Sequence, residues 1–287
     1  MIENFISSWA LFHQSYLTGW LVSLLLSLVG VLVVARDQIF IGAAVSEAST
    51  LGIALTLWAT AVVPEDQVPW VHSDIFPAAM AVVFSITAAS MTGRAGDEGR
   101  ESHEAITGWV FLTSAGLAVL IVSRSPHGVE EIHRLLSSSI IGATLADVWV
   151  FGILSGLTVA FLFLFYRKLL LFALDRSMAL AIGLRVRAWS FATSAWLGLA
   201  IGLSIRSSGM LYTFGCLVLP ALIAKNLCRE VRTMFLVAPI TAVVMAFIGF
   251  FFANSYDYPP GQLTVTLFCL VLVIAWGAGR LTRRASK

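Results

Sequence analysis

Long apolar runs separated by short polar segments make up most of this chain. The runs are long enough for an α-helix, which rises about 1.5 Å per residue, to cross a hydrocarbon core about 30 Å thick. We therefore predict an all-α, polytopic membrane helical bundle of about nine transmembrane segments, in a single transmembrane domain over residues 1–287. The predicted segments are residues 17–35, 40–62, 75–92, 105–123, 146–166, 188–205, 209–224, 234–253 and 263–279.

Composition supports the membrane class. Of the 287 residues, 59% are hydrophobic and 12% are charged. Soluble domains carry about 25% charged residues, and one of this size could not bury so much apolar surface. The polar stretches are all loops, so no separate soluble domain is expected.

The distribution of basic residues predicts the orientation. When successive loops are assigned alternately to two sides, fifteen of the 18 Lys and Arg residues fall on one side. Cytoplasmic loops carry an excess of Lys and Arg. We therefore predict that the N-terminus lies outside and the C-terminus lies in the cytoplasm.

The seventh apolar segment has signals for an irregular helix. It begins after Ser207-Ser208-Gly209 and contains Pro220. Proline removes one backbone donor and clashes with the preceding turn, so we predict that Pro220 kinks or breaks the helix. The segment either crosses the membrane or forms a re-entrant element.

Two GxxxG pairs lie in predicted spans, Gly152 with Gly156 and Gly198 with Gly202. Small residues at this spacing let two helices approach closely. The sequence leaves open whether either pair packs within one subunit or between two.

Catalytic and nucleotide-binding motifs are absent from the sequence. It contains no GxxxxGK[ST], no HExxH and no GxSxG. The chain is therefore expected to be neither an ATPase of the P-loop class nor a zinc or serine hydrolase. We expect no tightly bound cofactor and no nucleic-acid partner. The functions that remain are transport and scaffolding in the membrane.

One acidic residue, Glu47, lies inside the second apolar segment, in the stretch FIGAAVSEASTLGIAL. Helical spacing puts Ala43, Glu47 and Thr50 on one face, with Ser46 beside it. A carboxylate within a membrane helix is costly, so it usually faces the protein interior or a hydrated path. We predict that Glu47, Ser46 and Thr50 line such a path; the alternative is a structural bond from Glu47 to a neighbouring helix.

This stretch resembles the second-helix signature of the ABC-3 family, the permease subunits of bacterial ABC importers for zinc, manganese and iron. The family pattern is an arginine, a short spacer, then G-D-A-x-S-H-A and P-G-x-A-L. The family's Asp is Ala43 here and its His is Glu47. The residues that match are Arg36, Gly42, Ala44, Ser46, Ala48, Gly52, Ala54 and Leu55.

Three further blocks resemble the family in the same order. Residues 171–191 resemble its cytoplasmic coupling segment, which implies that a short helix docks there on an ATPase. Residues 209–227 resemble the block that contains Pro220, and residues 255–267 resemble the closing block. The implied coupling residues are Asp175, Arg176, Ala179, Ala181 and Gly183.

The resemblance implies a permease subunit in the bacterial plasma (inner) membrane, which carries a divalent metal ion (Zn, Mn or Fe) as transported substrate. Its implied partners are a cytoplasmic ABC ATPase, an extracytoplasmic metal-binding protein, a second permease copy or paralogue, and membrane lipid. Two alternatives stay open because both metal positions have changed. They are a permease for a metal chelate, siderophore or vitamin, and a non-transporting membrane scaffold.

Overall fold

The computed structural model is helical wherever it has regular secondary structure among the described residues. It describes residues 2–63, 68–73, 75–98, 102–123, 140–174, 176–228 and 230–285. The α-helices are α1 (Ile2–Ala35), α2 (Ile39–Val62), α3 (Ile75–Glu98), α4 (His103–Val122), α6 (Leu145–Leu174), α7 (Arg176–Ala181), α8 (Val186–Leu227), α9 (Val231–Tyr256) and α10 (Pro260–Ala285). Two short 3-10 helices are η1 (Pro69–His72) and η2 (Ile140–Gly142).

Eight helices in the described part of the chain are long and apolar enough to cross a membrane. The predicted all-α, polytopic fold is therefore confirmed. One of the eight, α8, has 42 residues and contains both the sixth and the seventh predicted segments. The orientation of the termini stays a prediction.

The break in α8 lies at Gly209, where the backbone has φ 78° and ψ 166°. Only glycine adopts this conformation readily, because a Cβ would clash with the backbone. The helix continues through Pro220, where we predicted the break. The residue with a non-helical backbone is Gly209, at the start of the segment, and a kink at Pro220 stays a prediction.

The helices form two compact units. The first unit contains residues 1–38, 139–175 and 211–287, and the second contains residues 39–138 and 176–210. The chain passes from one unit to the other just after the Gly209 break in α8. The prediction of one domain over residues 1–287 stays a prediction.

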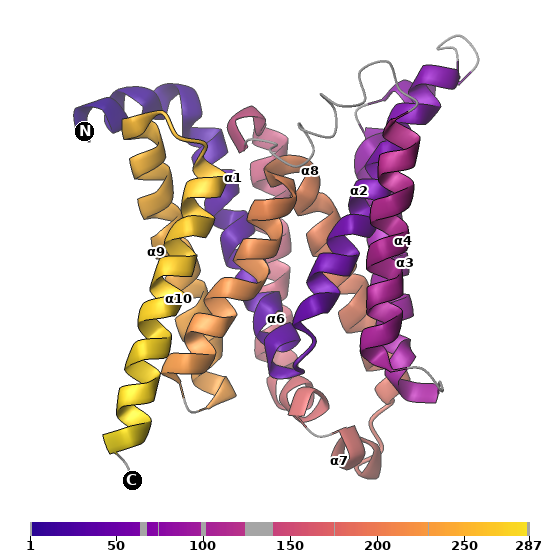
Figure 1. The fold of residues 1–287 in the computed structure, drawn as a ribbon, viewed down its shortest axis with the longest axis vertical. Helices are drawn as coiled ribbons and strands as arrows, with labels where there is room; N and C mark the ends of the chain where they lie inside the picture. Colours follow the sequence, from indigo (N-terminus) through magenta and orange to yellow (C-terminus); the bar gives the residue numbers. More distant parts are fainter. Residues whose placement is uncertain are drawn as a thin grey trace. The chain divides into compact units, whose positions relative to one another are not determined.

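In the first unit, α1 is the central helix and packs against α6 and α9. The α9 helix in turn packs against α10, and the two run side by side in Figure 1. Much of α1 is buried, including Val22, Leu25 and Leu26. The Tyr212 hydroxyl of α8 donates a hydrogen bond to the Gly19 carbonyl at 2.9 Å, which joins the second half of α8 to α1.

In the second unit, α2 is the central helix and packs against α3 and α4. Leu51 and Ala54 of α2 form a buried apolar cluster with Ala118 and Val122 of α4. The first half of α8 packs on α3, because Gly198 and Gly202 leave room for the α3 backbone near Ile86. This GxxxG pair therefore packs within the subunit.

Candidate functional site

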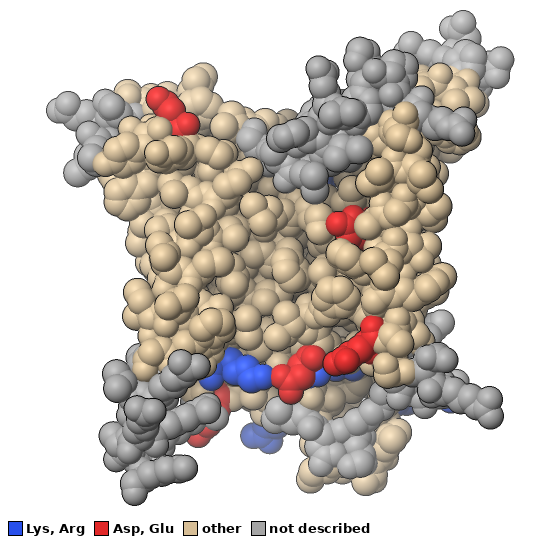
Figure 2. All heavy atoms as spheres, viewed as in Figure 1, with Lys and Arg blue, Asp and Glu red and all other residues tan. Residues whose placement is uncertain are grey.

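Glu47 is the only charged residue of α2. Ala44, Val45 and Ala48 next to it are buried, and Glu47 itself is half-buried. In Figure 2 the middle of the visible face is mostly uncharged, and most of the coloured charged side chains lie towards its two ends. The helix thus holds a carboxylate among apolar neighbours, where it is costly unless water, a cation or a polar partner reaches it.

Two serines of α2 near Glu47 in the sequence have hydroxyls without a partner among the described residues. The Oγ atoms of Ser46 and Ser49 are buried and have no hydrogen-bond partner among the described residues. The Thr50 hydroxyl donates to the Ser46 carbonyl at 3.1 Å, so it bonds back to the preceding turn of its own helix. Sequence reasoning selected Ser46 and Thr50 and missed Ser49, although its spacing of three from Ser46 places both serines on one face.

The site contains one carboxylate and no cluster of metal ligands. Within the described residues, no group of three or more His, Cys, Asp or Glu side chains could hold a metal ion. Ala43, at the position where the resemblance places an acid, is buried. Glu47 makes no hydrogen bond or ion pair in the part of the chain that the structure describes. One carboxylate can supply one or two oxygen ligands to a cation, but not a closed coordination shell.

The predicted coupling segment contains a short helix, α7, and a sharp turn after it. The Leu184 N–H donates to the Ala179 carbonyl at 3.0 Å, and the Gly183 N–H donates to the Leu180 carbonyl at 3.0 Å. These two bonds form a Schellman motif, in which the residue after the helix is left-handed. Gly183 has φ 79°, which explains why glycine occurs there.

The described side chains near the end of α7, and Ile182 just after it, include exposed apolar residues. Leu180 is 58% exposed and Ile182 is 59% exposed, although a six-residue helix is far too short to span a membrane. Ala179 is buried and Ala181 is exposed. Asp175 lies outside the described residues, and Arg176 is the first residue of α7.

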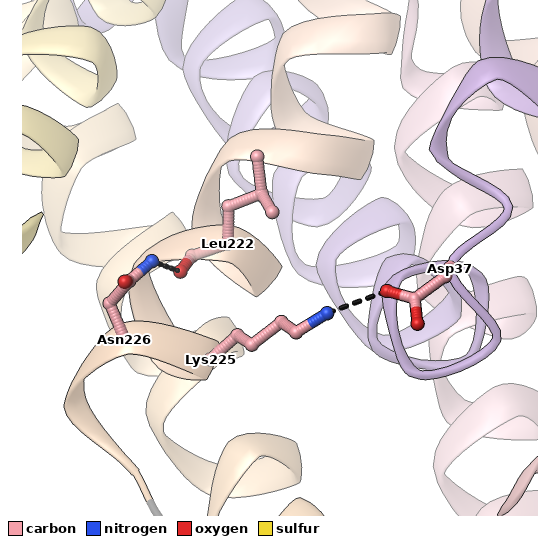
Figure 3. A network of polar contacts seen from close by, with 4 residues as sticks. All are labelled: Asp37, Leu222, Lys225 and Asn226. Carbon is pink, nitrogen blue, oxygen red and sulfur yellow. Dashed lines mark hydrogen bonds and ion pairs between the residues drawn. The ribbon is translucent and has the colours of Figure 1, made fainter.

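The connection from α1 to α2 is anchored within the first unit. The Lys225 ammonium at the end of α8 lies 2.7 Å from an Asp37 carboxylate oxygen (Figure 3). The Arg36 guanidinium lies 4.8 Å from the centre of the Phe172 ring in α6. Arg36, which the resemblance singled out, therefore holds the end of α1 against α6 within the first unit, whereas the exposed ion pair contributes little stability.

Comparison with protein families decides the affiliation of the chain. The model of the ABC 3 transport family matches residues 8–278. The chain belongs to the ABC 3 transport family. The resemblance to this family that we found in the sequence motifs is therefore confirmed over nearly the whole sequence.

Relatives in this family are named membrane proteins of metal transport systems. The chain is 22% identical to the manganese transport system membrane protein MntC of Listeria innocua, over 92% of this chain and 89% of the relative. It is 24% identical to the chelated iron transport system membrane protein YfeD of Yersinia pestis, over 84% and 76%. A match of 26% identity with a Haemophilus influenzae iron transport system membrane protein covers 61% of each chain.

Solved structures support the fold. PsaBC from Streptococcus pneumoniae, in complex with Fab, matches with a TM-score of 0.78 at 19% identity and covers 96% of this chain and 95% of that one. An inward-facing metal-chelate type ABC transporter matches with a TM-score of 0.69 at 16% identity and covers 91% and 84%. Similarity at this level of identity concerns the fold alone.

Membership in the ABC 3 transport family, together with the apolar helices, confirms a multi-pass membrane subunit of the bacterial plasma membrane. It also confirms that the chain is a transport subunit and not an enzyme. The roles of Glu47, the α7 residues and Pro220 in transport stay predictions.

Proposed function

We propose that the chain is the membrane-spanning permease subunit of an ABC importer that carries a divalent transition-metal ion into the cytoplasm. Its relatives are named for manganese, iron and chelated iron, which supports this substrate class. Carboxylate and hydroxyl oxygens suit Mn²⁺ and Fe²⁺ better than Zn²⁺, which prefers nitrogen and sulfur. We therefore rank manganese and iron ahead of zinc.

The observation that carries the proposal is Glu47, a half-buried carboxylate in the middle of a helix of small and apolar residues. An ionisable group in such a place is a functional candidate by default. Ser46, one residue before Glu47, adds a buried hydroxyl without a partner among the described residues, whereas Ser49 lies about 200° round the helix from Glu47. In our proposal a hydrated cation exchanges part of its water for the oxygens of Glu47 and Ser46 and then leaves, since a conduit must release its cargo.

The energy for transport would come from a cytoplasmic ABC ATPase that docks on α7. The exposed apolar side chains Leu180 and Ile182 fit a protein partner, because exposed apolar residues outside a membrane span favour an interface. The Schellman turn at Gly183 would keep α7 at a defined angle to the start of α8. The predicted cytoplasmic side of this segment agrees with such docking.

Two further partners complete the proposed importer. An extracytoplasmic metal-binding protein would deliver the ion to the outer loops, and a second permease, either a copy or a paralogue, would form the other wall of the path. A paralogue could supply the acid and the histidine that the family pattern has at the positions of Ala43 and Glu47. Alternating access between the two sides would move the ion.

Uptake of radioactive manganese tests the proposal. The chain is produced together with its ATPase and binding protein in cells that lack their own manganese importers. We expect Glu47→Gln to lower uptake roughly tenfold or more, because it removes a charge-assisted contact of about 1.5–3 kcal/mol to the cation.

The matched control is Glu230→Gln, which makes the same chemical change at an exposed residue whose side chain forms no cap bond. It is expected to leave uptake unchanged. Full manganese uptake by Glu47→Gln, at equal membrane levels, would exclude a role of this carboxylate in the path. No uptake of any cargo by the complete wild-type system, with no ATPase co-purifying, would instead indicate a scaffold.

A permease for a metal chelate is the second candidate. The absence of a ligand cluster within the described residues favours it, since a chelated ion needs no protein ligands. A competition experiment decides between an ion permease and a chelate permease. If the chain is an ion permease, excess free manganese abolishes the uptake of labelled manganese. If an iron chelate competes and free metal does not, the chain carries the chelate.

A further inference from the structure

A cavity of about 390 Å³ lies in the first unit, between the start of α1, η2 and the connection from α9 to α10. Its volume falls within the range of small-molecule sites, about 300–1,000 Å³. The residues that line it are Phe12, Ser15, Tyr16, Ile141, Phe250, Ala253, Asn254, Asp257, Tyr258, Pro259 and Pro260. None of them belongs to α2 or α7, so the cavity is separate from the proposed metal path and from the ATPase contact.

The cavity lies at a boundary between membrane and water. It is at the end of α9 and the beginning of α10, which are consecutive candidate spans, so their connection emerges from the membrane. Tyr256 and Tyr258 in this connection are more than half exposed. Exposed aromatic residues at the ends of spans lie at the level of the lipid headgroups.

One polar group of the cavity needs an acceptor. The Tyr16 hydroxyl donates to the Asn254 Oδ1 atom at 3.0 Å, which orients the amide. The Asn254 Nδ2 atom is buried and finds no acceptor among the described residues. A buried donor without a partner costs about 1–3 kcal/mol, so a ligand oxygen at this place would be favourable.

A second polar group of the cavity can bind a cation. Asp257 is exposed at the mouth of the cavity, and the described lining contains no Lys, Arg or His to balance its carboxylate. Phe12, Tyr16, Phe250 and Tyr258 surround the cavity with aromatic rings. A carboxylate beside aromatic rings is an arrangement that binds ammonium groups.

We propose that this cavity binds the headgroup of a zwitterionic phospholipid with a primary amine, of the phosphatidylethanolamine type. The ammonium group would donate to the Asp257 carboxylate, and a phosphate or ester oxygen would accept from the Asn254 Nδ2 atom. The acyl chains would continue along the apolar lining into the membrane. The proposal does not depend on the transported substrate.

Lipid retention tests the proposal on the full-length chain. The chain is reconstituted in vesicles of phosphatidylglycerol with an equal part of phosphatidylethanolamine, extracted in mild detergent, and examined by native mass spectrometry. We expect the wild type to retain phosphatidylethanolamine in preference to phosphatidylglycerol. Equal retention of both lipids would overturn the proposal.

Two variants test the residues. Asp257 has a left-handed backbone, φ 54°, which Asn tolerates, so Asp257→Asn removes the charge and keeps the turn. We expect it to weaken phosphatidylethanolamine retention about tenfold, because a charge-assisted hydrogen bond is lost. Ile141→Trp is expected to abolish retention by filling the cavity at an exposed position, while the backbone carbonyl of Ile141 still accepts from Ser15.

Glu230→Gln is the matched control, since it removes a carboxylate outside the cavity, and it should retain the lipid as the wild type does. Thermal unfolding of each variant in detergent verifies that it is folded. Unchanged retention in folded Asp257→Asn and Ile141→Trp would refute this site. Displacement of the lipid by an equal concentration of free phosphoethanolamine would show that the ligand is a soluble zwitterion, and this also contradicts a lipid site.

Discussion

Gly30 lies where α1 meets the second half of α8. A Cβ at this position would overlap the carbonyl oxygen of Leu217, which belongs to the backbone and cannot rotate away. Gly156 in α6 is the opposite case, because nothing lies within 4 Å of a Cβ built there. The two glycines thus have different physical roles, although both lie in transmembrane helices.

These positions predict opposite effects of the same substitution. Gly30→Ala should lower the free energy of unfolding by about 2 kcal/mol, because it forces two helix backbones apart. Gly156→Ala should leave it unchanged or raise it by up to about 1 kcal/mol, since alanine favours the helix more than glycine does. Thermal unfolding of the purified proteins in one detergent measures both; equal effects would contradict the close approach at Gly30.

At the scale of elements, α8 shows that a helix break depends on the backbone conformation and not on proline alone. Pro220 is buried inside a helical stretch, whereas Gly209 leaves the helical conformation. The glycine break also separates the part of α8 that packs on α3 from the part that packs on α1.

The break predicts which residue of α8 tolerates substitution. Gly209→Ala should cost about 1–3 kcal/mol, since its φ and ψ are accessible almost only to glycine. Pro220→Ala should change stability by less than about 1 kcal/mol, because the helix already passes through this position and the new N–H gains an acceptor in the preceding turn. A larger loss of thermal stability in Pro220→Ala than in Gly209→Ala would contradict this account.

The short helix α7 predicts a graded effect at Gly183. Val at this left-handed position costs about 1–2 kcal/mol and should disturb the turn, whereas Asn is tolerated there. If α7 is the ATPase contact, Gly183→Val lowers ATPase co-purification and uptake, and Gly183→Asn largely keeps both. Equal loss in the two variants would indicate that any side chain larger than hydrogen disturbs this position, and that the left-handed backbone turn is not the cause.

At the scale of the whole molecule, the sidedness of the chain can be measured without a transport assay. In a background without Cys216, Cys228 and Cys269, we expect Tyr258→Cys to react with a membrane-impermeant maleimide in intact spheroplasts. Ile182→Cys should react only after permeabilisation. Both native residues are well exposed, so access to the reagent depends on the side of the membrane. The reverse pattern would invert the predicted orientation and remove the ATPase from α7.

Several features of this protein are local, and the sequence was sufficient to predict them. Apolar length predicted the spans, because a helix must satisfy its own backbone groups in lipid wherever it lies. The same reasoning found Glu47, since a charge inside an apolar run is visible without any neighbour. The Ser-Ser-Gly at the start of the seventh segment marked the irregular position at Gly209, and the kink that we assigned to Pro220 stays a prediction.

Other features join residues far apart in the chain, and they became visible only in the folded molecule. Gly198 and Gly202 pack on α3 while Gly156 faces open space, yet both pairs have the same spacing in the sequence. Ser15, Tyr16, Ile141 and Asn254 meet in one cavity through contacts that span more than a hundred residues. Such contacts depend on which faces of the helices lie together. In lipid, all apolar faces are about equally well solvated, so the detailed packing between helices decides which faces meet.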